Sequence, residues 1–367
     1  MQVAGANHAS SPGKLPSLDG WRAISILLVL GDHCKYVWNF PPTLRPLFTW
    51  IFNGNLGVRC FFVISGFLIT YLLLREHDRT GGISLRRFYA RRVLRIFPVY
   101  YFFLLTVFLI QIASIWHQSQ IEWLSNLFFI TNFSHGPAAT SHLWSLAVEE
   151  QFYLLWPVTL YLIGPKNRRG ILGVLCIPMF ITPICRLLKN SHWLASLPPF
   201  ILPLFKNYSF LFYFDSLAVG CAAAVILVRQ EKLARRMADW KFTLLAFILF
   251  VATYCLSQMH LVEWFTNPLG NIVQAIALAI LLLQSILFPQ YFRPLNWPVV
   301  QRLGVLSFSI YIWQMLFCAN PVDFGWPNFW FMSIPGWLPV ALLAAVLSYY
   351  CLEKPLLAWR ERLRKAN

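Results

Sequence analysis

The chain has 367 residues, of which 58% are hydrophobic, 17% aromatic and only 12% charged. Charged residues make up about 25% of an average soluble protein, so this composition excludes an ordinary soluble enzyme. No polar stretch is long enough for a separate soluble domain, and the chain is predicted to be a membrane protein that crosses the bilayer many times.

Apolar segments close to the ~20 residues that cross a bilayer recur along almost the whole chain. We predict ten crossings, at residues 23–43, 56–74, 97–116, 143–163, 171–187, 208–228, 242–260, 268–288, 303–320 and 336–353. The segment Ile121–Phe133 is apolar but too short to cross, so we interpret it as an interfacial or re-entrant piece. The predicted fold is an all-α bundle of about ten transmembrane helices.

The formal net charge of +16 orients this bundle. If the N-terminus is cytoplasmic, 24 of the 30 lysines and arginines fall on the inner side, and the six outside are Lys35, Arg45, Arg59, Arg186, Lys189 and Lys206. This is the positive-inside pattern, and it predicts that both termini are cytoplasmic. The basic surplus then faces membrane lipids, and no nucleic acid is needed to explain it.

Both ends of the chain are interpreted as cytoplasmic tails. Residues 1–20 are polar and lack the apolar core of a cleaved signal peptide. Residues 357–367 form a short basic tail after the last predicted crossing. The eight cysteines are scattered without a Cys-x-x-Cys pair, so neither a disulfide framework nor a metal site is predicted.

His33 is the first candidate for chemistry. Arg22 lies at the inner edge of the first predicted crossing, and His33 follows it by 11 residues. At a rise of 1.5 Å per helical residue, His33 is ~16 Å from that edge, near the middle of the bilayer. Imidazole suits proton transfer near neutral pH, so His33 is a candidate general base. The alternative is a neutral packing residue with hydrogen bonds.

Glu149 and Glu150 stand side by side in an apolar helix, where each carboxylate commonly costs ~3 kcal/mol. Glu149 is expected within ~6 Å of the depth of His33, counted at 1.5 Å per residue. Because neighbouring helical positions point about 100° apart, only one of them is expected to face the same partner. The alternative is that Ser145 caps this helix and the glutamates complement its dipole.

A third cluster of candidates lies in the basic segment before the third predicted crossing. Arg92 falls within an apolar helical arc and Arg95 follows one turn later, so the two could clamp a phosphate, with Arg91 beside them. An internal ion pair is the alternative. Most other arginines of this segment need only the positive-inside explanation.

Other charges in or near apolar segments are assigned to ion pairs or to the wall of a substrate cavity; these are Asp19, Arg22, Arg59 and Asp215. Asp215 is expected to pair with a basic residue, and Arg59 with an external carboxylate or an acceptor. Glu353 is expected to form an ion pair at the cytoplasmic end of the last crossing. No Gly-x-Ser-x-Gly elbow, His-Glu-x-x-His motif or P-loop is present.

Several segments, in order along the chain, resemble the acyltransferase 3 family of integral membrane O-acyltransferases. They are Leu18–Ile24 followed by His33, Gly57–Thr70, Arg87–Pro98, His142–Pro157, Phe214–Gly220, Gly304–Trp313 and Glu353–Pro355. The resemblance implies a ten-helix core in a bacterial inner membrane. It also implies that His33 is the essential histidine, that Arg92 and Arg95 are the family's Arg-x-x-Arg pair, and that Glu149 and Glu150 are its paired acids.

The family transfers an acyl group, usually acetyl, from cytosolic acyl-CoA to a hydroxyl of an envelope glycan, a lipid-linked sugar or a lipo-oligosaccharide. The resemblance therefore implies acyl-CoA as donor substrate and no bound cofactor. Two positions depart from the pattern, because Arg59 stands where Asp is usual and Gln314 where His is frequent. The extracytoplasmic domain that some members carry is not expected after the tenth crossing.

The combined hypothesis is that Arg92 and Arg95 hold the CoA phosphates, while His33, oriented by Glu149 or Glu150, activates the acceptor hydroxyl or accepts the acyl group itself. The rival hypothesis is a transporter of a glycolipid or small molecule, in which His33 and Glu149 relay protons. The absence of an internal repeat disfavours the rival. The sequence leaves open the acceptor, the acyl group and the choice between direct transfer and an acyl-histidine.

Overall fold

The computed structural model describes residues 15–358, apart from 114–116, 135–138, 190–197, 199–201, 206–207 and 238. The described residues form helices, turns and irregular segments, and none of them forms a strand. Residues 1–14 and 359–367 lie outside the described part, so most of the two expected tails is not covered. The all-helical fold class is confirmed.

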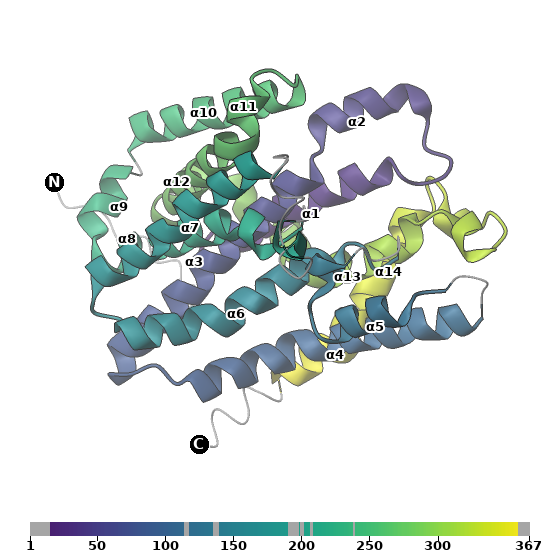
Figure 1. Cartoon of the computed structure of the whole chain (residues 1–367), viewed down its shortest axis with the longest axis horizontal. Coiled ribbons are helices and arrows are strands. Elements are labelled where there is room, and N and C mark those ends of the chain that lie inside the picture. The colour runs from purple at the N-terminus through teal and green to yellow at the C-terminus, as the bar shows by residue number, and fades with distance from the viewer. Residues whose placement is uncertain are drawn as a thin grey trace.

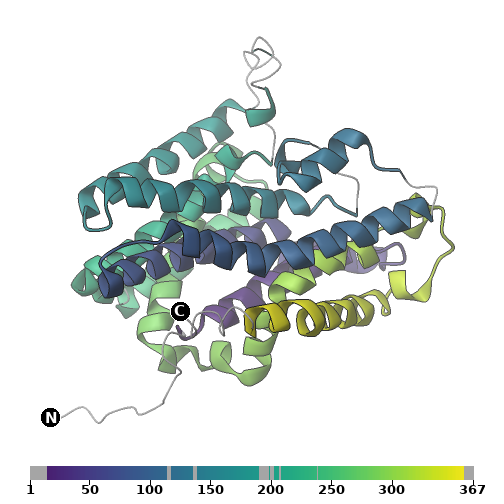
Figure 2. The ribbon, with the colours of Figure 1, turned by 90° about the horizontal axis from the view of Figure 1, so that it is seen from below.

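The long helices run roughly side by side in both views (Figures 1 and 2). In chain order the helices are α1 Leu18–Cys34, α2 Arg45–Ile51, α3 Gly54–Thr80, α4 Leu85–Ile112, α5 Gln120–Leu127, α6 Leu143–Ile163, α7 Arg168–Leu188, α8 Phe214–Arg229, α9 Glu231–Met237, α10 Trp240–Gln258, α11 Glu263–Phe265, α12 Asn271–Leu287, α13 Pro298–Cys318 and α14 Trp337–Ser348. A π-helical segment, Thr266–Gly270, leads into α12, and another, Tyr349–Glu353, follows α14. The segment Ile121–Phe133, predicted to be too short to cross, overlaps the 8-residue α5.

Seven helical stretches of the described chain are long and apolar enough to cross a membrane. They are Pro42–Thr80, Leu85–Ile112, Arg168–Leu188, Trp240–Gln258, Glu263–Leu287, Pro298–Cys318 and Trp337–Ala358. The chain is therefore a multi-pass membrane protein. The three other predicted crossings correspond to α1, α6 and α8; α1 and α8 have 17 and 16 residues, and α6 carries the two glutamates.

Two helices have ends that differ clearly from the crossings predicted for them. The first crossing, predicted at 23–43, is α1, which begins at Leu18 and ends at Cys34, so the apolar residues after Lys35 leave the helix. The third, predicted to begin at residue 97, is α4, which begins at Leu85 because Ser84 caps it by accepting a hydrogen bond from the Arg87 amide. The arginine segment is consequently part of a long helix.

Close helix packing at the centre of the bundle depends on glycines. A Cβ on Gly66 of α3 would lie 2.1 Å from the Leu217 carbonyl oxygen of α8, and one on Gly220 of α8 would lie 2.1 Å from the Val63 carbonyl oxygen of α3. Small residues at such crossings let two backbones touch, which is how helices gain packing energy in lipid. This reciprocal contact holds α3 against α8 and fixes the wall on which the polar site is built.

Candidate active site

A cavity of about 790 Å³, counting the space at its mouth, lies between α1, α3, α4, α6 and α13. Its charged lining residues are Arg22, Arg92, Arg95 and Glu149. Three arginines therefore face one carboxylate in a confined space. Such an excess of positive charge attracts and holds anions.

The arginines come from two helices. Arg22 belongs to the second turn of α1, and its Nη1 lies 3.8 Å from Oδ1 of Asp19, one turn earlier. The Arg92 guanidinium stacks over the Tyr153 ring at 4.3 Å from its centroid, and Arg95 follows one turn later on α4. Asp19 therefore accompanies Arg22 as an ion-pair partner, while the expected pair Arg92 and Arg95 lines the cavity.

Glu149 is the carboxylate of this cavity. Ser65 of α3 donates a hydrogen bond to Glu149 Oε1 at 2.5 Å, and the Tyr153 hydroxyl donates to Ser65 Oγ at 3.1 Å. Arg92, Arg22 and Arg95 are the cations whose charges act on Glu149. Ser65 and Tyr153 thus fix the direction in which this carboxylate points.

Glu150 has different surroundings. It does not line the cavity, and its Oε1 is buried without a hydrogen-bond partner among the described residues. Only Glu149 of the two adjacent glutamates lines the cavity, although the charge of Arg92 acts on Glu150 as well. The interpretation of Ser145 as helix cap is wrong, because His142 occupies the N-cap position and Ser145 lies inside α6, hydrogen-bonded to the Tyr311 hydroxyl.

His33 lies in the last turn of α1, one residue from its end, and does not line the cavity. The predicted crossing 23–43 has His33 at its middle, whereas α1 ends at Cys34 and has it one residue from the end; the depth of His33 in the bilayer stays a prediction. Asp32 and Lys35 flank His33 as an ion pair at 2.7 Å. The side chains close to His33 include Gln314 of α13 and His142. The structure shows no hydrogen bond or ion pair from Glu149 or Glu150 to His33 among the described residues.

Arg91 is not brought to the cavity. It forms an ion pair with Glu76 of α3 at 3.0 Å, and 42% of its side chain is exposed. Glu353 accepts a hydrogen bond from Ser309 and forms no ion pair with another described residue, so its expected pairing stays a prediction. The charges of Arg95 and Arg22 nevertheless act on it.

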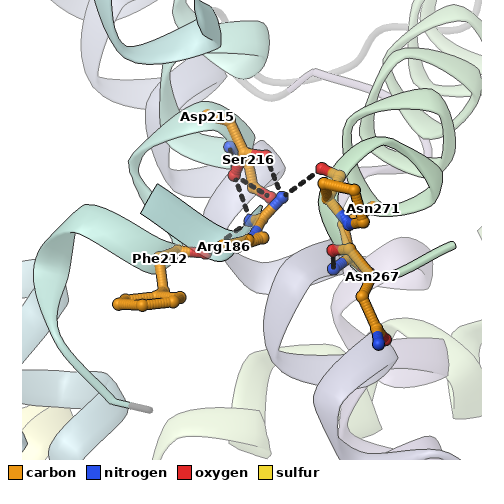
Figure 3. Close-up of polar contacts among 7 residues, drawn as sticks. Arg186, Phe212, Asp215, Ser216, Asn267 and Asn271 are labelled. Carbon is orange, nitrogen blue, oxygen red and sulfur yellow. Dashed lines mark hydrogen bonds and ion pairs between the residues drawn. The ribbon is translucent and has the colours of Figure 1, made fainter. Parts of the chain in front are cut away.

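Asp215 forms the ion pair expected of it. Its two carboxylate oxygens accept hydrogen bonds from Arg186 Nη1 at 2.7 Å and Nη2 at 2.9 Å. Arg186 also donates to the carbonyl oxygens of Phe212 and Pro268, so one buried guanidinium joins α7, α8 and the segment before α12 (Figure 3). This arrangement is structural, since all donors are used within the protein.

Arg59 of α3 lies near this pair and forms none of its own. It is 8% exposed, its guanidinium lies 5.3 Å from the centroid of the Tyr213 ring, and its Nη1 has no hydrogen-bond partner. Among the described residues Arg59 forms no ion pair, and the charges that act on it include those of Arg186 and Asp215.

Sequence reasoning missed the polar residues that shape the cavity. Ser65, Ser145, Tyr153, Ser307 and Tyr311 all line it. The sequence suggested Ser145 only as a helix cap. These hydroxyls lie on α3, α6 and α13, whose apolar patterns do not show which serine or tyrosine faces a cavity. Within the described residues, no group of three or more histidine, cysteine, aspartate or glutamate side chains is placed to hold a metal ion.

The chain is similar in sequence to several known proteins. The model of the acyltransferase 3 family, described as an acyltransferase domain, matches residues 15–353. YrhL of Bacillus subtilis is 28% identical over 370 residues, which cover 93% of this chain and 55% of YrhL. The peptidoglycan O-acetyltransferase OatA of Listeria monocytogenes is 27% identical over 382 residues, with coverage of 93% and 56%.

The O-acetyltransferase OatA of Staphylococcus aureus is 36% identical over 189 residues, which cover 47% of this chain and 29% of that protein. The chain spans little more than half the length of YrhL and of the Listeria protein. No solved structure matches it.

Proposed function

Because the chain belongs to the acyltransferase 3 family, we propose that it is an O-acetyltransferase of the bacterial inner membrane, moving an acetyl group from cytosolic acetyl-CoA to a hydroxyl of an envelope glycan. The observation that supports this most is the cavity with three arginines and one glutamate. The relatives named as O-acetyltransferases support acetyl as the group and a glycan as the acceptor.

The proposed topology has ten crossings, the seven apolar stretches together with α1, α6 and α8, and cytoplasmic termini. The basic residues at the ends of α3, α4, α7 and α9 favour this orientation through the positive-inside rule. In it, the cavity cations lie nearer the cytoplasm and His33 nearer the outside. Arg22 is four residues, or ~6 Å, from the start of α1, whereas His33 is in its last turn.

The donor is proposed to bind with its phosphates on Arg92, Arg95 and Arg22. Guanidinium groups form bidentate, charge-assisted hydrogen bonds with phosphate, so three of them suit a donor with several phosphates. Arg22 replaces Arg91 in this set, because Arg91 is paired with Glu76. The flexible pantetheine arm then carries the thioester along the cavity toward the outer end of the bundle.

The chemical step is proposed to take place at His33. The acceptor hydroxyl oxygen attacks the thioester carbon, its proton passes to His33, the carbon–sulfur bond breaks, and the CoA thiolate receives the proton as the ester forms. In the variant with an acyl-histidine, His33 attacks the thioester carbon and CoA leaves as the thiolate. The acceptor hydroxyl oxygen then attacks the acetyl group, the bond from His33 to the acetyl carbon breaks, and the hydroxyl proton passes to the thiolate. Glu149 is proposed to balance the arginines during this transfer, with Glu150 as a secondary acid.

Purified protein with labelled acetyl-CoA and soluble peptidoglycan strands tests the proposal. The wild-type protein is expected to release CoA in step with ester formation, and His33→Ala to abolish it. His260→Ala is the matched control, since the His260 side chain is 83% exposed and lies in a turn far from His33 in the sequence. Transport of a solute without ester formation would instead support the rival transporter, and full activity of His33→Ala would refute the role of His33.

The donor site has its own test. We expect Arg92→Ala combined with Arg95→Ala to weaken acetyl-CoA binding at least ~100-fold, since a hydrogen bond to a charged group contributes ~1.5–3 kcal/mol. Arg86→Ala combined with Arg87→Ala removes two exposed arginines of the same helix and controls for net charge. Equal affinity for acetyl-CoA in the two double variants would contradict the assignment.

A further inference from the structure

The cavity contains opposite charges that do not pair with each other. Glu149 lines it together with Arg22, Arg92 and Arg95, the cavity arginines. In the described part of the chain, none of these arginines forms an ion pair or a hydrogen bond with Glu149, and only Arg22 has a carboxylate partner, Asp19. Opposite charges attract more strongly in a protein interior than in water. Other groups must therefore hold Glu149 apart from the arginines.

Two hydroxyls in series hold this carboxylate. The Tyr153 hydroxyl donates to Ser65 Oγ at 3.1 Å, and Ser65 donates to Glu149 Oε1 at 2.5 Å. A serine hydroxyl has one hydrogen and accepts through its lone pairs, so the hydrogen that it receives from Tyr153 leaves its own for Glu149. A hydrogen bond to a carboxylate is charge-assisted and stronger than one between neutral groups. Ser65 thus gives Glu149 a partner that carries no positive charge.

Tyr153 also holds one of the arginines. Its side chain is buried, and its ring centroid lies 4.3 Å from the guanidinium carbon of Arg92, which is within the range of a cation–π contact. Tyr153 follows Glu149 by one turn of α6, so the ring and the carboxylate lie on the same face of this helix. A cation–π contact makes no hydrogen bond to an anion. The N–H donors of Arg92 therefore remain available to a ligand.

We propose that Ser65 and Tyr153 are positioning residues of the donor site: they keep Glu149 from pairing with the cavity arginines and so leave the guanidiniums available to the phosphates of acetyl-CoA. This inference rests on the proposed function, which places the phosphates on these arginines. Without Ser65, the Glu149 carboxylate loses its partner and swings to Arg92 or Arg95. The donor must then break an ion pair, and its affinity falls with the fraction of molecules in which the arginines are unpaired.

A double-mutant cycle on acetyl-CoA binding tests this, with isothermal titration calorimetry of the purified protein in detergent. Ser65→Ala is expected to raise the Kd for acetyl-CoA ~10-fold, which corresponds to an ion pair formed in ~90% of the molecules. Glu149→Gln removes the charge and is not expected to raise the Kd. When both substitutions are combined, no carboxylate is left to pair with the arginines. The Kd is then expected to lie within about twofold of that of Glu149→Gln.

Two further variants separate this effect from a general loosening of the bundle. Tyr153→Phe keeps the ring and removes the hydroxyl that donates to Ser65, so a smaller rise in Kd is expected, which Glu149→Gln should also cancel. Thr70→Val is the matched control. Thr70 accepts a hydrogen bond from Trp156 Nε1 at 2.8 Å, across the same two helices, α3 and α6, and does not line the cavity. Its loss is expected to leave the Kd unchanged.

The outcomes of this cycle are distinct. An unchanged Kd in Ser65→Ala, or an equal rise in Thr70→Val, would overturn the inference. So would a raised Kd that persists when Ser65→Ala is combined with Glu149→Gln, because Ser65 would then act on the donor or on packing and not through the carboxylate. If the wild-type protein does not bind acetyl-CoA, the proposed function itself fails. If it binds and the cycle shows no coupling, this inference alone fails.

Discussion

Glu149 and Glu150 are adjacent in the sequence and have different neighbours. Glu149 lines the cavity with three arginines and accepts a hydrogen bond from Ser65, whereas Glu150 does not line it. The difference follows from the helix, since consecutive positions point about 100° apart. The two carboxylates should therefore contribute unequally to any reaction in this cavity.

We expect Glu149→Gln to lower kcat for acetyl transfer at least ~10-fold, because one charge-assisted interaction is worth ~1.5–3 kcal/mol. The substitution keeps size and hydrogen-bonding capacity, so the loss reports the charge. The KM for acetyl-CoA is not expected to rise, since removing a carboxylate makes the cavity more positive toward phosphates. Initial rates at varied acetyl-CoA measure both quantities. Glu150→Gln should cost less, and equal losses would contradict the assignment.

At this scale, the residue types could be predicted and most of their contacts could not. Burying a carboxylate or a guanidinium in an apolar helix costs so much free energy that such a residue can be recognised from the sequence as a functional candidate, as Glu149 and Arg92 were. Its partner lies on another helix, so no spacing in the sequence indicates that Arg91 pairs with Glu76 or that Arg92 stacks on Tyr153. His142 entered only as the first residue of the family-like segment His142–Pro157, because one histidine before an apolar helix is ordinary.

The contact between α3 and α8 is the first feature at the scale of elements. We expect Gly220→Ala to destabilise the protein by ~1–3 kcal/mol, because its Cβ would meet the Val63 carbonyl at 2.1 Å and the helices must separate. Thermal unfolding in detergent, followed by loss of the monodisperse species, measures this. Gly173→Ala is the matched control, since nothing lies within 4 Å of a Cβ at that helical glycine. A melting temperature equal to the control would refute the close packing.

The buried ion pair between α7 and α8 makes a second prediction. Asp215→Asn leaves Arg186 buried without its counter-charge, and breaking such a pair costs ~3–5 kcal/mol. We expect a strong fall in melting temperature. Glu231→Gln breaks the exposed pair with Arg235 and should cost at most ~1 kcal/mol. If the two variants melt together, the Arg186–Asp215 pair is not the junction described above.

Helix existence was predictable and helix ends were less so. Hydropathy located a helix for each of the ten expected crossings, because roughly twenty apolar residues suffice to cross lipid. The ends depend on capping and on neighbours, as at Ser84, which starts α4 twelve residues before the predicted crossing. The end of α1 at Cys34 had the largest consequence, since it moved His33 from the middle of a helix to its last turn.

At the scale of the whole molecule, the cavity and His33 occupy different depths of one bundle. The cavity arginines lie toward the helix ends that carry most of the basic residues, while His33, His142 and Gln314 lie toward the opposite ends. With the proposed orientation, donor phosphates bind near the cytoplasm and the acceptor binds near the outside. Neither the donor nor the acceptor then has to cross the whole bilayer to reach its site.

This arrangement predicts that acetyl-CoA is used from one side only. Inside-out membrane vesicles, whose cytoplasmic face is exposed, are expected to convert added labelled acetyl-CoA into glycan ester, whereas right-side-out vesicles are not, because acetyl-CoA does not cross lipid and the arginines face the lumen. Vesicles with Arg92→Ala and Arg95→Ala provide the background in both orientations. Equal ester formation by right-side-out vesicles would contradict the orientation, since both substrates would then have reached the site from outside.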